Sequence, residues 1–372
     1  MLNFIDLFSG AGGISCGLER AGHKCLLGVD YDKYAIETFN HNHRDAEGIC
    51  IDLRELSNRR FKSLISKQKV NLIAGGPPCQ GFSTVGTGNP NDKRNHLFSQ
   101  FLRAVELFKP EYILIENVTG LLAKKNQKTL NAILKCFSDL GYVLNFNVLS
   151  SEEYGVPERR RRTIIIGSRI NDIVWMPTKL RSKPKTVGDV IEKIYCRGGV
   201  ALNHNIETAI PKNSLDLKRL KHIPEGRGIR YQADEKELLP KRLRFDVEWE
   251  NLPEKRFRQA KYQRLDRSKP SPTIMTQRGN YYHPTEDRYL TAREAAKLQS
   301  FPNHYEFKGT LSAQWKQIGN AVPPTLAYYL GKHFTELSSV ATYKRNRKKI
   351  VKEWETTIHK ERENAFVYRN QA

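Results

Sequence analysis

The fold of this chain depends on one stretch, Val70-Asn71-Leu72-Ile73-Ala74-Gly75-Gly76-Pro77-Pro78-Cys79. Its apolar first half predicts a buried strand. Two glycines and two prolines then end that strand and fix the direction of the backbone. Open α/β sheets bind their ligands at the carboxyl ends of strands, so the thiol of Cys79 is a candidate functional group. The alternative is a small buried hydrophobic residue, which is the commoner place of an unpaired cysteine.

Short apolar runs alternate with amphipathic stretches along the first half of the chain, and this alternation predicts an α/β fold. The predicted strands lie at residues 4–8, 24–29, 49–53, 70–74, 111–115, 142–149 and 163–167. Helical patterns separate most of these runs, as is typical of parallel strands joined by crossover helices. We therefore expect a sheet with helices on both faces.

A glycine turn, Ser9-Gly10-Ala11-Gly12-Gly13, joins the first predicted strand to an amphipathic helix. Glycines allow a ligand to approach the backbone closely, and the helix N-terminus offers free N–H groups. The turn therefore indicates a nucleotide-like ligand. Ser15 occupies the place of the third glycine of a dinucleotide fingerprint, which disfavours a hydride-transferring oxidoreductase.

Acidic residues follow the next two predicted strands. Asp30 stands about 20 residues past the glycine turn, where a carboxylate can accept both ribose hydroxyls. Alternatively, Asp30 caps the helix that begins near Lys33. The ring of Tyr31 could lie against an adenine, and Asp52 could accept a hydrogen bond from the amine of a base.

A further acid and an arginine run end two later segments. Glu116 follows the strand at 111–115, so it would lie with Cys79 at one edge of the sheet, unless it caps a helix or braces a loop. The run Pro157-Glu158-Arg159-Arg160-Arg161-Arg162 leads into another strand. Because side chains alternate along a strand, Arg160 and Arg162 would share one face, and we expect one pair of arginines to point into the cleft.

The formal net charge of +22 favours a polyanionic partner, nucleic acid before membrane. No secretory or membrane-spanning stretch is evident in the sequence. Six cysteines occur without Cys-x-x-Cys pairs, which argues against a zinc site and a disulfide framework and favours a reducing cytoplasm. Between Cys79 and the next helix, residues 83–97 read as a mobile loop, in which Lys93 and Arg94 could meet phosphates.

From about residue 175 to 280 the alternation of strands and helices fades, and basic residues are interleaved with aromatic ones. This composition predicts a separate, smaller domain laid against nucleic acid. Its candidate phosphate or guanine contacts are Arg227, Arg230, Arg242, Arg244, Arg256, Arg258 and Lys261. The sequence does not distinguish among them.

Five motifs now stand in one order: Asp6-Leu7-Phe8-Ser9-Gly10-Ala11-Gly12-Gly13, Gly76-Pro77-Pro78-Cys79-Gln80-Gly81-Phe82-Ser83, Glu116-Asn117-Val118, Arg160-x-Arg162 and Gly319-Asn320-Ala321-Val322-Pro323-Pro324. Over about residues 2–335 the chain closely resembles the DNA cytosine-5 methyltransferases, particularly the single-chain prokaryotic modification enzymes. The resemblance implies the Rossmann-like mixed sheet of S-adenosylmethionine-dependent methyltransferases, with a smaller, irregular target-recognition domain. The implied boundaries are 1–175 for the catalytic and cofactor-binding domain, 176–285 for target recognition, 286–340 for a hinge and return, and 341–372 for a charged C-terminal extension.

The resemblance also implies roles for the catalytic residues. Cys79 would add to C6 of a cytosine, Glu116 would hydrogen-bond or protonate N3, and Arg160 with Arg162 would grip O2. The target base would swing out of the duplex, and the loop 83–97 would close behind it. Glu158 departs from the family pattern, which usually has glutamine there, so the usual backbone role of that position is in doubt.

The implied cofactor is S-adenosyl-L-methionine. The residues that the resemblance places around it are Phe8, Gly10, Gly12, Gly13, Asp30, Tyr31, Asp52, Leu53, Pro78, Asn320 and Val322. The implied partner is double-stranded DNA, and the implied setting is a restriction-modification system. We expect a monomer without metal or membrane attachment, located in the cytoplasm and associated with the nucleoid through DNA.

Two alternatives remain at the level of sequence. An RNA cytosine-5 methyltransferase would share the fold, but its usual Cys-Phe-Thr tripeptide is absent from this sequence. A catalytically silent relative would bind DNA without modifying it. The presence of Cys79, Glu116 and the arginine motif disfavours that second alternative.

Overall fold

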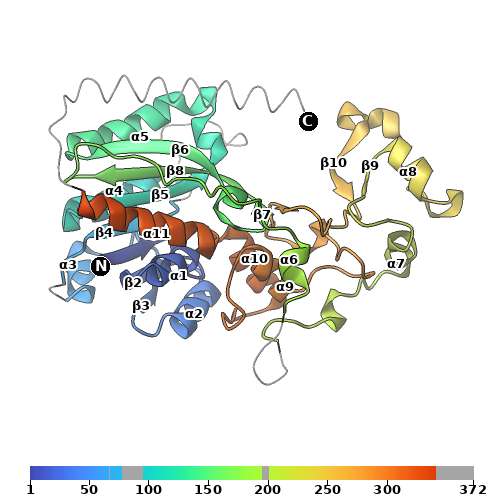
Figure 1. The fold of residues 1–372 in the computed structure, drawn as a ribbon, viewed down its shortest axis with the longest axis horizontal. Helices are drawn as coiled ribbons and strands as arrows, with labels where there is room; N and C mark the ends of the chain where they lie inside the picture. The colour runs from blue at the N-terminus through green and yellow to red at the C-terminus, as the bar shows by residue number, and fades with distance from the viewer. Residues whose placement is uncertain (67, 78–94, 195–200, 341–372) are drawn as a thin grey trace. The chain divides into compact units, whose positions relative to one another are not determined.

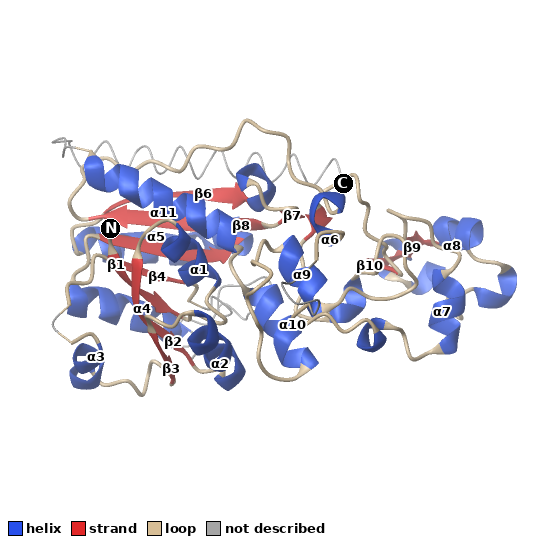
Figure 2. Cartoon of the chain, turned by 60° about the horizontal axis from the view of Figure 1, so that its bottom comes forward, coloured by secondary structure: helices blue, strands red, loops and turns tan. Residues whose placement is uncertain are grey.

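The computed structural model describes residues 1–66, 68–77, 95–194 and 201–340. The chain divides into two compact units. The sheet unit comprises Met1–Tyr154, Arg161–Leu180 and the stretch that begins at Val322, and the insertion unit comprises Gly155–Arg160 and Arg181–Ala321. Figures 1 and 2 show the elements of each unit. The domain boundaries expected from the resemblance remain predictions.

The sheet unit is built on a seven-stranded sheet in the order β3-β2-β1-β4-β5-β8-β6. Its strands are β1 (Asn3–Leu7), β2 (Lys24–Asp30), β3 (Glu47–Cys50), β4 (Leu72–Gly75), β5 (Tyr112–Val118), β6 (Val143–Ser150) and β8 (Arg161–Ser168). Strands β1 to β5 are parallel, whereas β8 runs antiparallel to both β5 and β6. The mixed α/β sheet expected from the sequence is confirmed.

Helices cover both faces of this sheet. They are α1 (Gly13–Arg20), α2 (Lys33–Asn42), α3 (Asn58–Leu64), α4 (Asn95–Phe108), α5 (Gln127–Asp139) and α11 (Pro324–Ser339). On one face, Ile5 and Ile113 share an apolar core with residues of α3, α4 and α5. On the other, Asp6 accepts a hydrogen bond from Ser15 of α1, and Tyr112 contacts the ring of Phe334 in α11. Burial on both faces explains why most strands are continuous apolar runs.

The last helix of the unit, α11, packs closely against α1. A Cβ atom at Gly17 would lie 2.4 Å from the Cβ of Ala327, so only glycine permits this approach. His23 joins the same seam, because its Nδ1 accepts from the backbone of Leu2 and its Nε2 donates to the carbonyl of Gly331. The stretch after the insertion unit thus completes the sheet unit.

The insertion unit has little regular structure, as its composition predicts. Its elements include β7 (Glu158–Arg159), α6 (Gly188–Ile191), α7 (Ser214–Leu220), β9 (Ile229–Tyr231), α8 (Gln232–Leu238), β10 (Arg256–Lys261), β11 (Ser271–Pro272), α9 (Ala292–Leu298) and α10 (Leu311–Asn320). Two two-stranded sheets pair β9 with β10 and β7 with β11. A small apolar core around Leu220, Ile229 and Trp249 supports the β9–β10 region.

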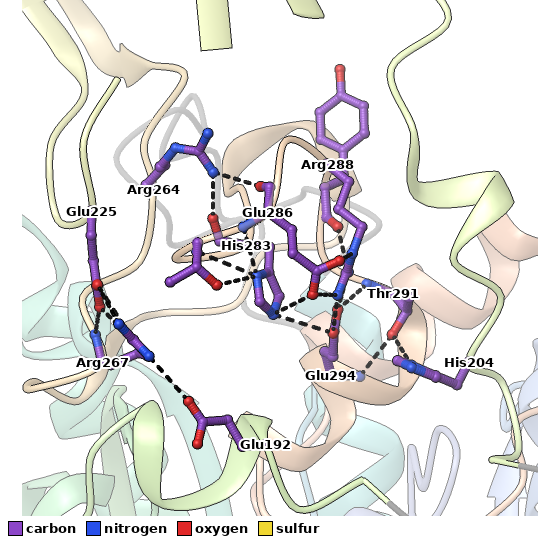
Figure 3. Close-up of polar contacts among 12 residues, drawn as sticks. Glu192, His204, Glu225, Arg264, Arg267, His283, Glu286, Arg288, Thr291 and Glu294 are labelled. Carbon is purple, nitrogen blue, oxygen red and sulfur yellow. Dashed lines mark hydrogen bonds and ion pairs between the residues drawn. The ribbon is translucent and has the colours of Figure 1, made fainter. Parts of the chain in front are cut away.

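Buried ion pairs replace regular structure in part of the insertion unit (Figure 3). Arg264 is 4% exposed and donates to the carbonyls of Leu220, Ile223, His283 and Glu286. Arg288 forms a bidentate pair with Glu294 of α9, at 2.7 and 2.8 Å. Arg264 thereby holds the turn that contains His283 and Glu286, and Arg288 links the segment after that turn to α9. An arginine-rich composition alone could not separate them from arginines that bind a ligand.

Candidate active site

The glycine turn lies at the carboxyl end of β1 and has an unusual backbone. Phe8, Gly10 and Gly12 adopt φ values of 59°, 52° and 86°, in the left-handed region. A non-glycine residue such as Phe8 is strained there, and such strain concentrates at functional sites. Gly12 is also the N-cap residue of α1 and offers no side chain to the first turn of that helix. The turn therefore exposes backbone rather than side chains.

Asp30 ties the end of β2 to this turn. Its carboxylate accepts hydrogen bonds from the backbone N–H groups of Gly10 and Asp32, both at 2.9 Å. Burial raises the pKa of Asp30, while these hydrogen bonds oppose the rise. The cap of α2 is Asp32, whose side chain accepts from the N–H groups of Tyr34 and Ala35. The alternative that Asp30 caps this helix is therefore wrong.

The surroundings of the turn fit a polar ligand with a flat ring. The ring of Tyr31 is 66% exposed just after β2. The buried hydroxyl of Ser9 has no hydrogen-bond partner among the described residues. A Cβ atom at Gly10 would meet no atom of the described residues within 4 Å, so these residues leave open space beside the backbone. These features are compatible with S-adenosylmethionine at the predicted place.

Asp52 and Leu53, which follow β3, differ in what they offer a ligand. Arg54 holds the carboxylate of Asp52 from two nitrogens, with Nη2 to Oδ2 at 2.6 Å and Nε to Oδ1 at 3.0 Å. This pairing lowers the pKa of Asp52. Leu53 is 3% exposed and packs in the apolar core. Only its backbone could therefore contact a ligand.

The other predicted cofactor residues are divided between the units or lie outside the described residues. Gly13 opens α1, and Val322 is buried in the sheet unit. Asn320 is exposed at the end of α10 in the insertion unit. Pro78 and Cys79 lie outside the residues that the structure describes, as do Lys93, Arg94 and most of the expected loop.

Glu116 and Arg162 meet at the edge where the parallel strands end. In the antiparallel pairing of β5 with β8, Val118 stands opposite Arg162. The Nε atom of Arg162 lies 3.0 Å from Oε1 of Glu116, and the two side chains are only 18% and 12% exposed. The two atoms are within ion-pair distance, although Oε1 has no hydrogen-bond partner among the described residues. Glu116 thus faces Arg162 rather than a helix N-terminus.

The segment that leads to Cys79 passes this ion pair. Asn117, which follows Glu116, donates from Nδ2 to the carbonyl of Pro77 at 3.0 Å. A Cβ atom built on Gly76 would lie 3.3 Å from Oε2 of Glu116. Residues 76 and 77 therefore run directly beside the carboxylate. The sequence motif places Asn117 here, but its role as an anchor was not expected.

Arg160 has different partners from Arg162. It belongs to the insertion unit, is 2% exposed, and donates to the carbonyls of Gly319 and Asn320 at 3.0 and 3.4 Å. The expected alternation fails because β7 ends at Arg159 and β8 begins at Arg161, so no single strand carries both side chains. Glu158 stands where the family usually has glutamine. Its side chain accepts a hydrogen bond from the backbone N–H of Ile274 at 2.6 Å, so this side chain bonds to the backbone.

In the part of the chain that the structure describes, no group of three or more His, Cys, Asp or Glu side chains could hold a metal ion. No helix described there is long and apolar enough to cross a bilayer. The cysteines Cys16, Cys25, Cys50 and Cys136 are free thiols.

The sequence pattern of the family described as C-5 cytosine-specific DNA methylase matches residues 2–336. The chain belongs to this family. As a C-5 cytosine-specific DNA methylase, it is a DNA methyltransferase, and this membership favours DNA over RNA as its substrate class.

Curated relatives agree over most of the chain. It is 36% identical over 333 residues to the type II methyltransferase M1.HphI of Haemophilus parahaemolyticus, covering 88% of this chain and 84% of the relative. It is 31% identical over 375 residues to the type II methyltransferase M.DdeI of Desulfomicrobium norvegicum, covering 90% and 88%. Similarity on this scale extends through both units.

Solved structures share the fold. A prophage-encoded protein of Escherichia coli, described as a DNA modification methyltransferase, is 27% identical with a TM-score of 0.65, covering 91% of this chain and all of that one. The Dnmt2 methyltransferase of Schizosaccharomyces pombe is 18% identical with a TM-score of 0.62, covering 91% and 99%. At that identity the second likeness concerns the fold alone. The predicted methyltransferase fold is confirmed.

Proposed function

We propose that this methyltransferase transfers a methyl group from S-adenosyl-L-methionine to C5 of a cytosine within a specific double-stranded DNA sequence. We further propose that it is the modification enzyme of a type II restriction-modification system, like the relatives named above. The observation that carries the mechanism is the Glu116–Arg162 ion pair beside residues 76 and 77. It brings an acid and a cation to the segment that continues into Cys79.

The first step is nucleophilic addition. C5 of cytosine is a weak nucleophile, but addition of the Cys79 thiolate to C6 forms a C–S bond and moves the electron pair of the C5–C6 double bond toward N3. Glu116 hydrogen-bonds N3 or gives it a proton, which leaves C5 as the nucleophilic carbon of an enamine. Cys79 stands two residues after Pro77, so the anchoring of Pro77 by Asn117 supports this assignment.

Arg162 and Arg160 take separate roles in this proposal. Arg162 places a positive charge beside the Glu116 carboxylate, and the N–H groups of its guanidinium that do not donate to the carbonyl of Arg161 would be available to the O2 atom of the cytosine. Arg160 is a positioning residue, because its guanidinium fixes the carbonyls at the end of α10. Asn320, one of the predicted cofactor residues, is the last residue of α10.

The cofactor supplies a methyl group made electrophilic by a sulfonium. The glycine turn would hold its methionine and adenosine parts, Asp30 its ribose, Tyr31 and Asp52 its adenine. C5 would take the methyl group with the enamine electron pair, and the thioether S-adenosylhomocysteine would leave with the electron pair of the broken methyl–sulfur bond. The proton at C5 then leaves to a base, its electron pair re-forms the C5–C6 double bond, and the C6–S bond breaks to release the thiolate of Cys79. The target base must leave the duplex for this chemistry, since stacking hides C6.

Transfer of a labelled methyl group to DNA tests the proposal. Purified protein, S-adenosylmethionine labelled in the methyl group and unmethylated genomic DNA should give label at C5 of cytosine, and Cys79→Ala should give none. The buried thiol variant Cys25→Ala is the matched control and should retain the activity. Equal incorporation by wild type and Cys79→Ala would refute the covalent mechanism, whereas label in RNA but not in DNA would refute the proposed substrate.

A further inference from the structure

The basic residues of the insertion unit fall into two groups that the sequence could not separate. Arg227 pairs with Glu237, Arg244 donates to the carbonyls of Leu239 and Lys236, and Arg256 pairs with Glu254. The guanidinium of each therefore already has a partner within the protein. These side chains would have to give up that partner before binding a ligand.

Three arginines from the same set of candidates are different. Arg230, Arg242 and Arg258 are exposed, and their side chains have no hydrogen bond or ion pair among the described residues. An arginine has five donors in a rigid fork that matches acceptors on phosphate or on guanine. Arg230 and Arg258 lie on β9 and β10, which are paired with each other, whereas Arg242 lies in a separate turn.

The two paired strands form an irregular ribbon. In the register of the two strands, Arg256 stands opposite Tyr231 and Lys261 stands opposite Ile229. Residues 257–260 of β10 therefore stand opposite Arg230 alone. An insertion of this kind is a bulge, and bulges direct side chains outward next to functional sites. Within the bulge, Arg258 and Gln259 are exposed. Figure 1 shows the ribbon beside α8.

The backbone of the ribbon is held from both ends. Glu254, Lys255 and Tyr262, which flank β10, have φ values of 54°, 49° and 52°. Non-glycine residues in this left-handed region are strained and persist only where the surrounding structure enforces them. The carboxylate of Asp234 accepts from the backbone N–H groups of Arg230 and Tyr231, both at 2.9 Å. These hydrogen bonds hold the backbone of β9, and the left-handed residues set the backbone direction where β10 begins and ends.

A cluster of three aromatic rings, Phe245, Trp249 and Phe257, includes one residue of the same ribbon and is called the aromatic floor below. The ring of Phe257 contacts those of Phe245 and Trp249, with centroids 5.3 and 4.6 Å apart. Glu235 of α8, only 4% exposed, fixes this floor by accepting from the indole N–H of Trp249 and from the backbone of Phe245. The same ribbon therefore combines Phe257, which packs in this aromatic cluster, with the exposed side chains of Arg230, Arg258 and Gln259.

We infer that the β9–β10 ribbon is the base-reading element of this enzyme, with Arg230 and Arg258 directed to guanines and Gln259 to an adenine. The major groove of DNA admits a two-stranded ribbon. Arginine donates in bidentate fashion to O6 and N7 of guanine, and glutamine pairs with N6 and N7 of adenine. Arg230, Arg258 and Gln259 are therefore specificity-determining residues. This inference rests on the proposed function and adds which residues choose the site.

A library of duplexes with randomised positions around a cytosine tests the inference. Wild type, Arg230→Ala, Arg258→Ala and Gln259→Ala would each methylate the library, and bisulfite sequencing would rank the modified sites. Arg258→Gln keeps a long polar side chain at the bulge if the alanine variant should unfold. Arg267→Ala is the matched control, because Glu225 and Glu192 already bind that exposed arginine.

Arg230→Ala and Arg258→Ala should each lose roughly 10- to 100-fold of the preference for guanine at one position while other positions keep theirs. Arg258→Gln should shift that position toward adenine, and Arg267→Ala should keep the wild-type ranking. An unchanged ranking in the ribbon variants would overturn the inference, and so would a uniform loss at all sites, which indicates phosphate contacts. If the wild type modified no cytosine at C5, the proposed function itself would fail.

Discussion

Arg162 lies with Nε 3.0 Å from Oε1 of Glu116, across the antiparallel pairing of β8 with β5. Among the described strands of this sheet, β8 alone runs opposite to its neighbours, β5 on one side and β6 on the other. The antiparallel β8 begins at the edge where the parallel strands end, so its first residues meet the last residues of β5. A purely parallel sheet could not place an arginine from the start of a strand there.

The first prediction concerns Glu116. Glu116→Gln keeps the shape of the side chain but cannot give a proton to N3, so the rate of methyl transfer should fall by roughly 100-fold or more. Binding of S-adenosylhomocysteine, measured by calorimetry, should stay within about twofold of wild type, because no acid–base step is involved in binding. Glu111→Gln, at the surface before β5, is the control and should keep the wild-type rate. A Glu116→Gln enzyme with the wild-type rate would remove this residue from the chemistry.

The second prediction concerns Asp52 and Arg54. If Asp52 accepts from the 6-amino group of adenine, wild type should bind S-adenosylhomocysteine roughly tenfold more tightly than S-inosylhomocysteine, which has an oxygen there. Asp52→Asn should lower this preference most. Arg54→Ala should lower it partly, since Arg54 orients the carboxylate from two nitrogens. Glu55→Gln should leave both affinities alone, and an equal loss of affinity for both ligands in Asp52→Asn would argue against recognition of the amine.

Most strands of the sheet unit could be predicted because they are apolar runs between turn residues, and burial on both faces leaves such runs almost uninterrupted. The exception is β3 at the edge of the sheet, whose residues Glu47–Cys50 are exposed or half-buried, so the run predicted at 49–53 overlaps it only in part. The placement of Asp30 and Glu116 at one edge of the sheet could be predicted from the same apolar runs, because the carboxyl ends of parallel strands lie at the same edge.

The break at Arg160 could not be predicted in this way. Arg160 donates to the carbonyls of Gly319 and Asn320, which are far along the sequence. The local run of arginines gives no information about these two acceptors.

The insertion unit shows the same limit. Its basic and aromatic composition indicated a nucleic-acid surface, but composition could not show that Arg264 is buried beneath carbonyls whereas Arg258 is exposed. That difference arises from tertiary packing. The cap of α2 was also not predicted, because Asp30 and Asp32 both precede this helix and the sequence analysis considered only Asp30, whereas the cap is Asp32.

The third prediction concerns the seam between α1 and α11. Gly17→Ala would place a Cβ 2.4 Å from both the Cβ of Ala327 and the carbonyl oxygen of Pro324. The backbone must shift, so the free energy of unfolding should fall by about 1–3 kcal/mol. Gly120→Ala is the matched control, because the nearest atom that its Cβ would meet in the described part of the chain is Cγ2 of Val118 at 3.9 Å. Urea denaturation measures both, and equal stability of the two variants would contradict the close packing of α11.

The fourth prediction concerns Asp6, whose carboxyl group is fully buried and accepts from the hydroxyl of Ser15 at 2.7 Å. Burial raises the pKa of Asp6 to about 7 from its ordinary value of 3.8. The folded protein therefore keeps a proton that the unfolded chain has released. The free energy of unfolding due to Asp6 is highest below pH 3.8, falls as the pH rises, and is lost above about pH 7.

Asp6→Asn should remove this dependence, because an amide does not titrate. The slope attributable to Asp6 approaches about 1.4 kcal/mol per pH unit between the two pKa values. Urea denaturation of wild type and Asp6→Asn between pH 5 and about pH 8 measures the difference in unfolding free energy. Buried histidines such as His23, whose pKa is lowered by burial, give the opposite slope, but they are common to both proteins and cancel in the difference. A difference that does not change with pH would show that Asp6 is already ionised in the folded protein.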